Sequence, residues 1–187
     1  GIIKRVYNDT GRVAYETYLG IAETYYHFGH YRKSLDALNQ AEIIYDKSIE
    51  KHASFLPSKS LLLARINVQM GYLNKADSIV TDCLPKLENR IMRSEKGVDG
   101  KGRTKNIKVG SFDFKARKQA YAWATSTQAD IALKRGLNDT ADSLLKLSNR
   151  WVDKNLGSRN PVKMQNFQAI ASIEESKGNL RTATAYN

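Results

Sequence analysis

The stretch Thr24-Tyr-Tyr-His-Phe-Gly-His-Tyr-Arg-Lys-Ser-Leu-Asp-Ala-Leu38 places one glycine, Gly29, between two runs of helix-forming sequence. Gly29 either breaks one helix or joins two consecutive helices. Glycine adopts the left-handed backbone conformation at little cost, and it therefore often ends a helix whose chain then turns back. If the chain is built from helix pairs, the surroundings of Gly29 should recur.

Small residues recur at fixed offsets around four glycines, which are Gly29, Gly71, Gly136 and Gly178. Seven residues before each glycine stand Ala22, Ala64, Ala129 and Ala171. Five residues after each stand Ser34, Ala76, Ala141 and Ala183, and twelve after the first three stand Ala41, Cys83 and Ser148. Side chains of this size let two antiparallel helices pack closely. Gly29 is therefore predicted to join two helices.

The first unit reads Tyr18, Ile21, Ala22, Tyr25, Gly29, Tyr31, Ser34, Leu38 and Ala41 at its repeated positions. This ladder of aromatic, small and glycine positions resembles the tetratricopeptide repeat (TPR) family. The resemblance implies an all-α fold, in which antiparallel helix pairs stack into a right-handed superhelical solenoid. Such stacks use their extended surfaces to bind other proteins.

The repeat is longer than the usual period of about 34 residues in that family. Gly29 and Gly71 are 42 residues apart, and so are Gly136 and Gly178. This length resembles the long repeats of the kinesin light chain type, and the link Asn155-Leu-Gly-Ser-Arg-Asn-Pro161 is similar to the connection between units there. Pro161, like Pro57 in the corresponding link, should lie in the first turn of a helix.

The spacing predicts a single array over residues 1–187, with units at about 11–50, 57–93, 113–154 and 161–187. The expected helices span residues 11–28, 31–50, 57–70, 73–93, 113–135, 138–154, 161–177 and 180–187. Residues 1–8 should end a preceding helix. Because both ends fall inside repeat units, we expect a fragment of a longer chain that carries an effector domain elsewhere.

A basic insertion is expected at about 94–111, between the second and third units. The segment 93–110 contains six basic residues, two acidic residues and four glycines. Such loops are usually solvated connections. The alternative is a contact with a polyanion, made by Lys101, Arg103, Lys105 and Lys108. The segment lacks the Gly-Lys-Ser/Thr ending of a phosphate-binding loop.

The formal net charge of +11 should attract acidic proteins, nucleic acids or anionic lipid, or else serves solubility alone. Cys83 is the only cysteine, which excludes an internal disulfide bond and a Cys-based zinc site. This favours a cytoplasmic location, with the periplasm as the alternative. No apolar run approaches the roughly 18 residues that a membrane span needs.

No pattern of catalytic residues is present. The metalloprotease, nucleophile-elbow and dinucleotide-binding motifs are all missing. His27 and His30 are three residues apart, but Gly29 ends the helix between them, and Cys83 stands at a small-residue position typical of a core. We therefore expect no enzyme activity, no cofactor and no metal site in this segment.

The resemblance implies a concave face formed by the first helix of each unit. The side chains expected to bind a partner there are Glu16, Leu19, Glu23, Tyr26, His27, Leu61, Arg65, Gln69, Trp123, Asp130 and Lys134. Ser58, Val68, Ser126 and Leu133 are expected on the same face. The alternative for any one of them is packing between neighbouring helices. Because this face mixes apolar side chains with both signs of charge, it suits an amphipathic peptide ligand better than a uniformly acidic one. The Lys and Asn clamp with which some relatives hold chaperone tails is absent, and so is the asparagine ladder of the kinesin light chain groove.

These features predict an interaction scaffold, or a sensor or regulatory module of a larger bacterial-type regulator. Its partner would be a protein, a peptide or an effector domain of the same chain. The alternative is nucleic-acid or other polyanion binding through the insertion and the positive surface, which should weaken steeply with salt. Tyr25, Tyr31 and Phe167 belong to the repeat pattern, so few aromatic side chains remain to stack on bases.

Deletion of residues 95–110 should leave the helical content nearly unchanged, because loop length has only a small effect on stability. Circular dichroism of the deletion variant beside the wild type measures this directly. A large loss of helical signal would show that the insertion packs into the helices.

Overall fold

A computed structural model describes residues 11–47, 56–95 and 112–186, and these residues form eight helices and no strand. The helices follow in four pairs: α2 (Arg12–His27) with α3 (Tyr31–Lys47), α4 (Leu56–Gln69) with α5 (Leu73–Glu95), α6 (Phe112–Lys134) with α7 (Asn138–Asn155), and α8 (Pro161–Ser176) with α9 (Leu180–Tyr186). The all-α prediction is thus confirmed for the described residues. The observed bounds agree with the expected ones to within about three residues.

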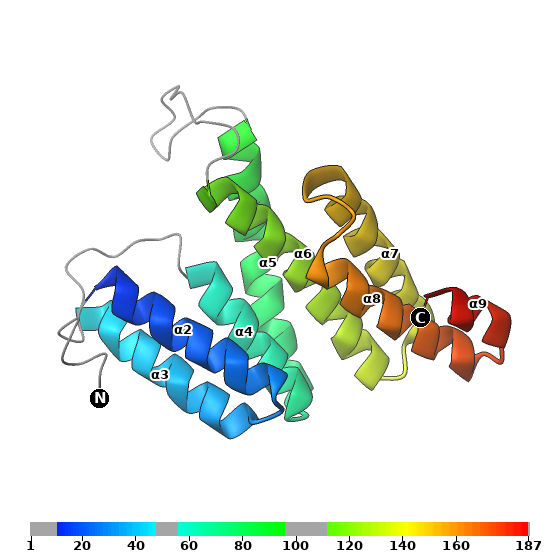
Figure 1. The fold of residues 1–187 in the computed structure, drawn as a ribbon, viewed down its shortest axis with the longest axis horizontal. Coiled ribbons are helices and arrows are strands. Elements are labelled where there is room, and N and C mark those ends of the chain that lie inside the picture. The colour runs from blue at the N-terminus through cyan, green and yellow to red at the C-terminus, as the bar shows by residue number, and fades with distance from the viewer. Residues whose placement is uncertain (1–10, 48–55, 96–111, 187) are drawn as a thin grey trace.

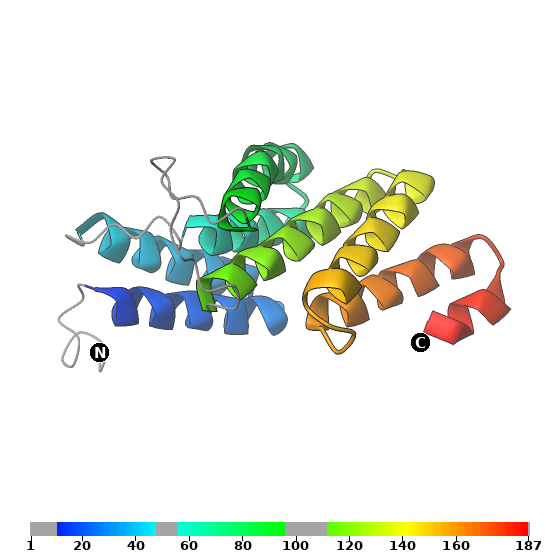
Figure 2. The same ribbon diagram turned by 90° about the horizontal axis from the view of Figure 1, so that it is seen from above.

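The pairs follow one another along the long axis of the molecule, with α2 and α3 at one end and α9 at the other (Figure 1). Each first helix also contacts the first helix of the next unit: α4 touches α2 and α6, and α6 touches α8. Viewed from above, α6 runs obliquely to α2 (Figure 2). The right-handed superhelical form implied by the family resemblance stays a prediction.

Gly29 joins α2 to α3 in the manner expected. Its φ of 75° is left-handed, and its N–H donates to the Tyr26 carbonyl at 3.0 Å while the His30 N–H donates to the Tyr25 carbonyl at 2.9 Å. These two bonds satisfy carbonyls that the helix end would otherwise leave unpaired. The same pair of bonds closes the turns at Gly71, Gly136 and Gly178.

The repeated small residues lie where paired helices meet. Ala22, Ala64 and Ala129 have no exposed surface, and neither do Ser34 and Ala141. The short distance between α2 and α3 also allows a hydrogen bond between them: the Ser34 hydroxyl donates to the Ala22 carbonyl at 2.7 Å. Ser148 does the same in the third unit, where it donates to the Ala122 carbonyl at 3.1 Å. The repeat in the sequence therefore marks the contact line within each pair.

The hydrophobic core continues from one unit to the next. One cluster joins α4, α5 and α6 through buried residues that include Val68, Val80 and Ala124. A second cluster joins α2 and α3 to α4, where Leu62 and Ile66 are buried. Because each cluster draws on two units, a unit alone cannot bury its apolar face.

The prolines occupy different places. Pro161 begins α8, and the preceding Asn160 accepts a hydrogen bond from the Val162 N–H at 3.0 Å, which caps the helix. Pro57 lies in the first turn of α4. Pro85 lies inside α5. Pro85 is exposed, so its ring does not take part in the packed core.

Ala64→Leu should overpack the contact between α4 and its neighbours and lower the free energy of unfolding by about 1–3 kcal/mol. Urea denaturation followed by circular dichroism gives the value. Ala185→Leu, at an exposed position of α9, is the matched control and should change stability by less than about 0.5 kcal/mol. Equal stability of the wild type and Ala64→Leu would contradict the contact line proposed for α4.

Candidate functional site

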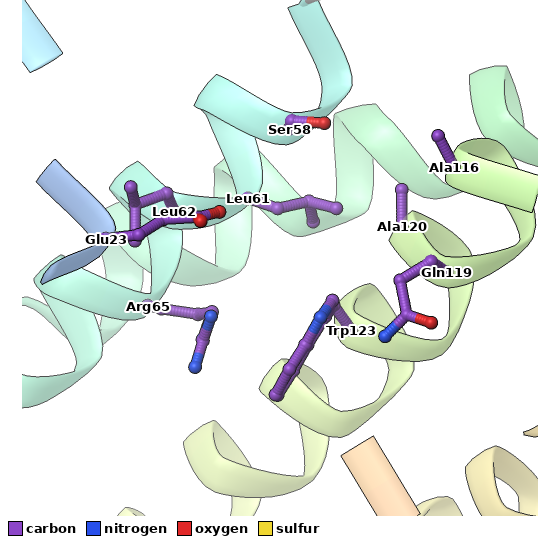
Figure 3. A pocket seen from close by; sticks show the side chains of 9 residues that line it. All are labelled: Glu23, Ser58, Leu61, Leu62, Arg65, Ala116, Gln119, Ala120 and Trp123. Carbon is purple, nitrogen blue, oxygen red and sulfur yellow. The ribbon is translucent and has the colours of Figure 1, made fainter. Parts of the chain in front are cut away.

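A pocket of about 160 Å³ lies between the first helices of three successive units. Helix α2 contributes Glu23, α4 contributes four residues and α6 contributes four (Figure 3). The lining residues are Glu23, Ser58, Leu61, Leu62, Arg65, Ala116, Gln119, Ala120 and Trp123. Leu61 and Leu62 give the wall beside Arg65 an apolar character.

Arg65 lies against two aromatic rings at this pocket. The central carbon of its guanidinium group is 4.4 Å from the centre of the Tyr26 ring and 4.0 Å from the centre of the Trp123 ring. Figure 3 shows the guanidinium group and the indole ring facing each other across the pocket. A desolvated cation over an aromatic face is stabilised by about 1–2 kcal/mol. The contacts hold side chains of α2, α4 and α6 together.

The guanidinium group of Arg65 nevertheless lacks a hydrogen-bond acceptor. The residue is only 7% exposed, and its Nη2 atom is buried with no hydrogen-bond partner in the described part of the chain. No ion pair within 4.0 Å joins it to a described carboxylate. A buried donor left without an acceptor costs about 1–3 kcal/mol or more when charged. The site thus holds a free cationic donor that an incoming acceptor could satisfy.

Asp130, one of the residues expected at the site, is a half-buried carboxyl group on α6 that feels the charge of Arg65. Burial raises the pKa of Asp130 to about 6, although the charges of Arg65 and Lys134 act in the opposite direction. Desolvation therefore outweighs attraction, as is common where a carboxylate has no close partner. Asp130 offsets part of the Arg65 charge but does not bond to it.

Gln119 forms one wall of the pocket and is already held in place. Its side-chain amide donates to the Asn160 side chain at 3.3 Å and accepts from it at 2.8 Å. The same Asn160 caps α8, so the wall is tied to the start of the fourth unit. With both ends of the Gln119 amide engaged, Arg65 is the side chain at this site with an unused buried donor.

The structure brings together part of the residue set expected for partner binding. Glu23, Leu61, Arg65 and Trp123 line the pocket, and so does Ser58 of the same expected face. Tyr26 lies against Arg65, and the charge of Arg65 acts on the pKa of Asp130. The other expected residues lie outside the pocket, and these are Glu16, Leu19, His27, Gln69 and Lys134. Leu19 packs against two core clusters instead. Lys101, Arg103, Lys105 and Lys108 fall outside the described residues.

Four lining residues, Leu62, Ala116, Gln119 and Ala120, were not among those expected, and the spacing of the three on α6 could have identified them. Ala116, Gln119, Ala120 and Trp123 stand at i, i+3, i+4 and i+7 of α6, which places them on one helix face. Leu62 is one position from Leu61 and lies where α4 meets both α2 and the pocket. Three of the four missed residues can thus be found by extending the face of Trp123 backwards.

Other chemistry has little support in the described part of the chain. No group of three or more His, Cys, Asp and Glu side chains there could hold a metal ion. Cys83 is buried, and burial raises the pKa of its thiol, which disfavours the reactive thiolate. Among the described helices, none combines the length and apolar character needed to cross a lipid bilayer.

Comparison of the chain with protein-family models, curated proteins and solved structures found no significant match. Function is therefore inferred from the geometry of the pocket and its side chains.

Asp130→Asn should stabilise the protein at pH 7 by about 1–2 kcal/mol. A carboxyl group whose pKa is raised on folding lowers stability as pH rises from about 4, near its unfolded pKa, through about 6. The difference between variant and wild type should therefore vanish near pH 4. Urea denaturation across this pH range measures it.

Asp82→Asn is a suitable control for that experiment, because Asp82 is exposed and pairs only with Lys86 on the same helix at 2.6 Å. Its removal should cost at most about 0.5 kcal/mol. If Asp130→Asn were less stable than the wild type at pH 7, attraction to Arg65 would outweigh the burial of the carboxylate.

Proposed function

We propose that this chain is a protein-interaction module that binds a peptide segment of a partner in the pocket between α2, α4 and α6. The observation that carries the proposal is the buried guanidinium of Arg65, whose Nη2 atom is unpaired and which lies against two aromatic rings in a pocket with apolar and polar walls. A scaffold or regulatory role, as one array within a larger protein, follows from the TPR-like repeat and is part of the same proposal.

The size of the pocket favours a peptide over a free small molecule. Pockets that bury drug-sized ligands usually measure about 300–1,000 Å³. This one has about 160 Å³, close to cavities that hold a single benzene-sized group. One large apolar side chain would fill it, and the remainder of its ligand would have to lie along the neighbouring helices. A peptide segment of a partner protein meets this requirement.

The arrangement of the helices supports a ligand that extends past the pocket. Three successive first helices contribute to its lining, and their contacts continue from α6 to α8. Stacked helix pairs bind extended peptides or partner helices along such surfaces. The right-handed superhelical form and its concave face belong to this proposal, because they would bring these first helices into one continuous groove.

Nucleic-acid binding remains the second candidate because of the net charge of +11. The pocket itself does not favour it, since Glu23 lines it and Asp130 lies near Arg65. A polyanion would therefore have to bind elsewhere on the chain. The two candidates predict different sensitivity to salt and to changes in the pocket.

Linear peptides selected from a display library against the 187-residue chain should lose about tenfold or more in affinity when Ala116 is replaced by Phe. Ala116 is exposed and lines the pocket, so the ring would occupy the ligand's space without entering the core. Ala185→Phe, an equally exposed position on α9, is the matched control and should bind like the wild type. Isothermal titration calorimetry gives both affinities.

Equal affinity of the selected peptides for the wild type and for Ala116→Phe would show that the peptides do not bind in the pocket. Binding of single-stranded RNA or duplex DNA is measured in parallel at low and moderate salt. Nucleic-acid binding that is strong, falls steeply with salt and is indifferent to Ala116→Phe, without peptide binding, would favour the second candidate.

A further inference from the structure

The guanidinium of Arg65 is a buried cation with an unpaired donor in the described structure. The residue is 93% buried, since it is 7% exposed, and its Nη2 atom has no hydrogen-bond partner. Its favourable contacts are with the rings of Tyr26 and Trp123, which accept no conventional hydrogen bond. A buried cation normally has a bonded acceptor, so the site is complete only when one arrives.

We propose that Arg65 binds a single carboxylate of the peptide ligand, beside the apolar side chain that fills the pocket. This inference rests on the proposed function and adds the chemistry of one ligand group. The carboxylate would belong either to an acidic side chain or to the C-terminus of the peptide, and both sources present the same two oxygen atoms.

The geometry at Arg65 suits a planar acceptor. The indole ring of Trp123 and the phenol ring of Tyr26 contact the guanidinium and restrict its motion, while its buried Nη2 donor stays unused. A guanidinium edge matches the two oxygen atoms of a carboxylate, and both hydrogen bonds can form at once. Because the group is already desolvated and oriented, binding sacrifices little side-chain freedom.

The surrounding charges favour one negative charge over two. Glu23 lines the same pocket, and Asp130 is close enough for the Arg65 charge to act on its pKa. Two carboxyl groups near one buried cation would repel a dianionic phosphate more strongly than a carboxylate. Within the described part of the site, Arg65 is the only basic side chain that lines the pocket. The site thus differs from the clusters of several basic residues that hold phosphate groups.

The test compares four synthetic peptides on the wild-type chain: acetyl-Leu-Glu-Phe-Leu-amide, the same peptide with Gln or phosphoserine in place of Glu, and the Gln peptide with a free C-terminal acid. The signal followed is the Nε–Hε resonance of Arg65 in nitrogen-15 spectra, assigned by its loss in Arg65→Lys. The Glu peptide should shift this resonance saturably and bind about tenfold more tightly than the Gln peptide. The wild-type comparison does not depend on how any variant folds.

The free-acid Gln peptide identifies the source of the carboxylate. If it binds as tightly as the Glu peptide and shifts the same resonance, the natural group is a C-terminus, and if only the Glu peptide does so, it is a side chain. In Arg65→Lys, whose fold is verified by circular dichroism, the preference for the Glu peptide should fall by about tenfold, because lysine lacks the planar fork.

Equal binding of the Glu and Gln peptides, or no shift of the Arg65 resonance with either, would overturn the inference. Tighter binding of the phosphoserine peptide would overturn it as well, because the site would then favour a dianion. The proposed function can hold even if this inference fails. Library peptides could bind in a way that depends on Ala116, yet contain no acidic group and leave the Arg65 resonance unshifted. That result would support peptide binding in the pocket and overturn the role of Arg65 as a carboxylate site.

Discussion

Close approach of the two helices within each pair is the constraint on which the structure depends. Residues at the contact line have no room for a large side chain, and the hydroxyl of Ser34 bridges the two backbones by donating to the Ala22 carbonyl at 2.7 Å. The left-handed turn at Gly29 directs the chain back along itself without leaving carbonyls unpaired. A single helix pair has apolar surface that is buried only where the next pair packs against it. Folding of the array is therefore expected to be cooperative between neighbouring units.

The pocket is a product of that array and of no single unit. Arg65 stands on the middle helix α4, and its two ring partners, Tyr26 and Trp123, come from the first helices on either side. Any change in the way α2 or α6 packs on α4 would move a ring away from the guanidinium. The candidate site and the packing between units are therefore coupled, and a ligand that bonds to Arg65 would stabilise the contacts among three units at once.

The sequence predicted the parts of the fold that depend on local rules. Glycine turns and small contact residues recur at fixed offsets, so the repeat pattern alone predicts the helix pairs and the residues at which they meet. Arg65, Tyr26 and Trp123 were named individually for the same reason. Their mutual stacking could not be inferred, because Arg65 and Trp123 are separated by the basic insertion, and the register of α6 on α4 depends on packing across it. Gln119 could have been placed on the helix face of Trp123 from its spacing, but its hydrogen bond with Asn160, which is 41 residues away, could not have been inferred.

The electrostatics of the site give the strongest argument for a binding role. Asp130 is half-buried near Arg65, yet no ion pair joins the two groups among the described residues and Arg65 Nη2 has no partner; in keeping with this, burial raises the pKa of Asp130 to about 6. If Arg65 served stability alone, pairing it with Asp130 or replacing it by an apolar residue would be the favourable arrangement. The fold instead places the cation against two aromatic rings and leaves its buried Nη2 donor without an acceptor, at a cost to the free protein. A carboxylate supplied by a partner would remove that cost on binding, so the same feature that lowers the stability of the free chain would contribute to affinity.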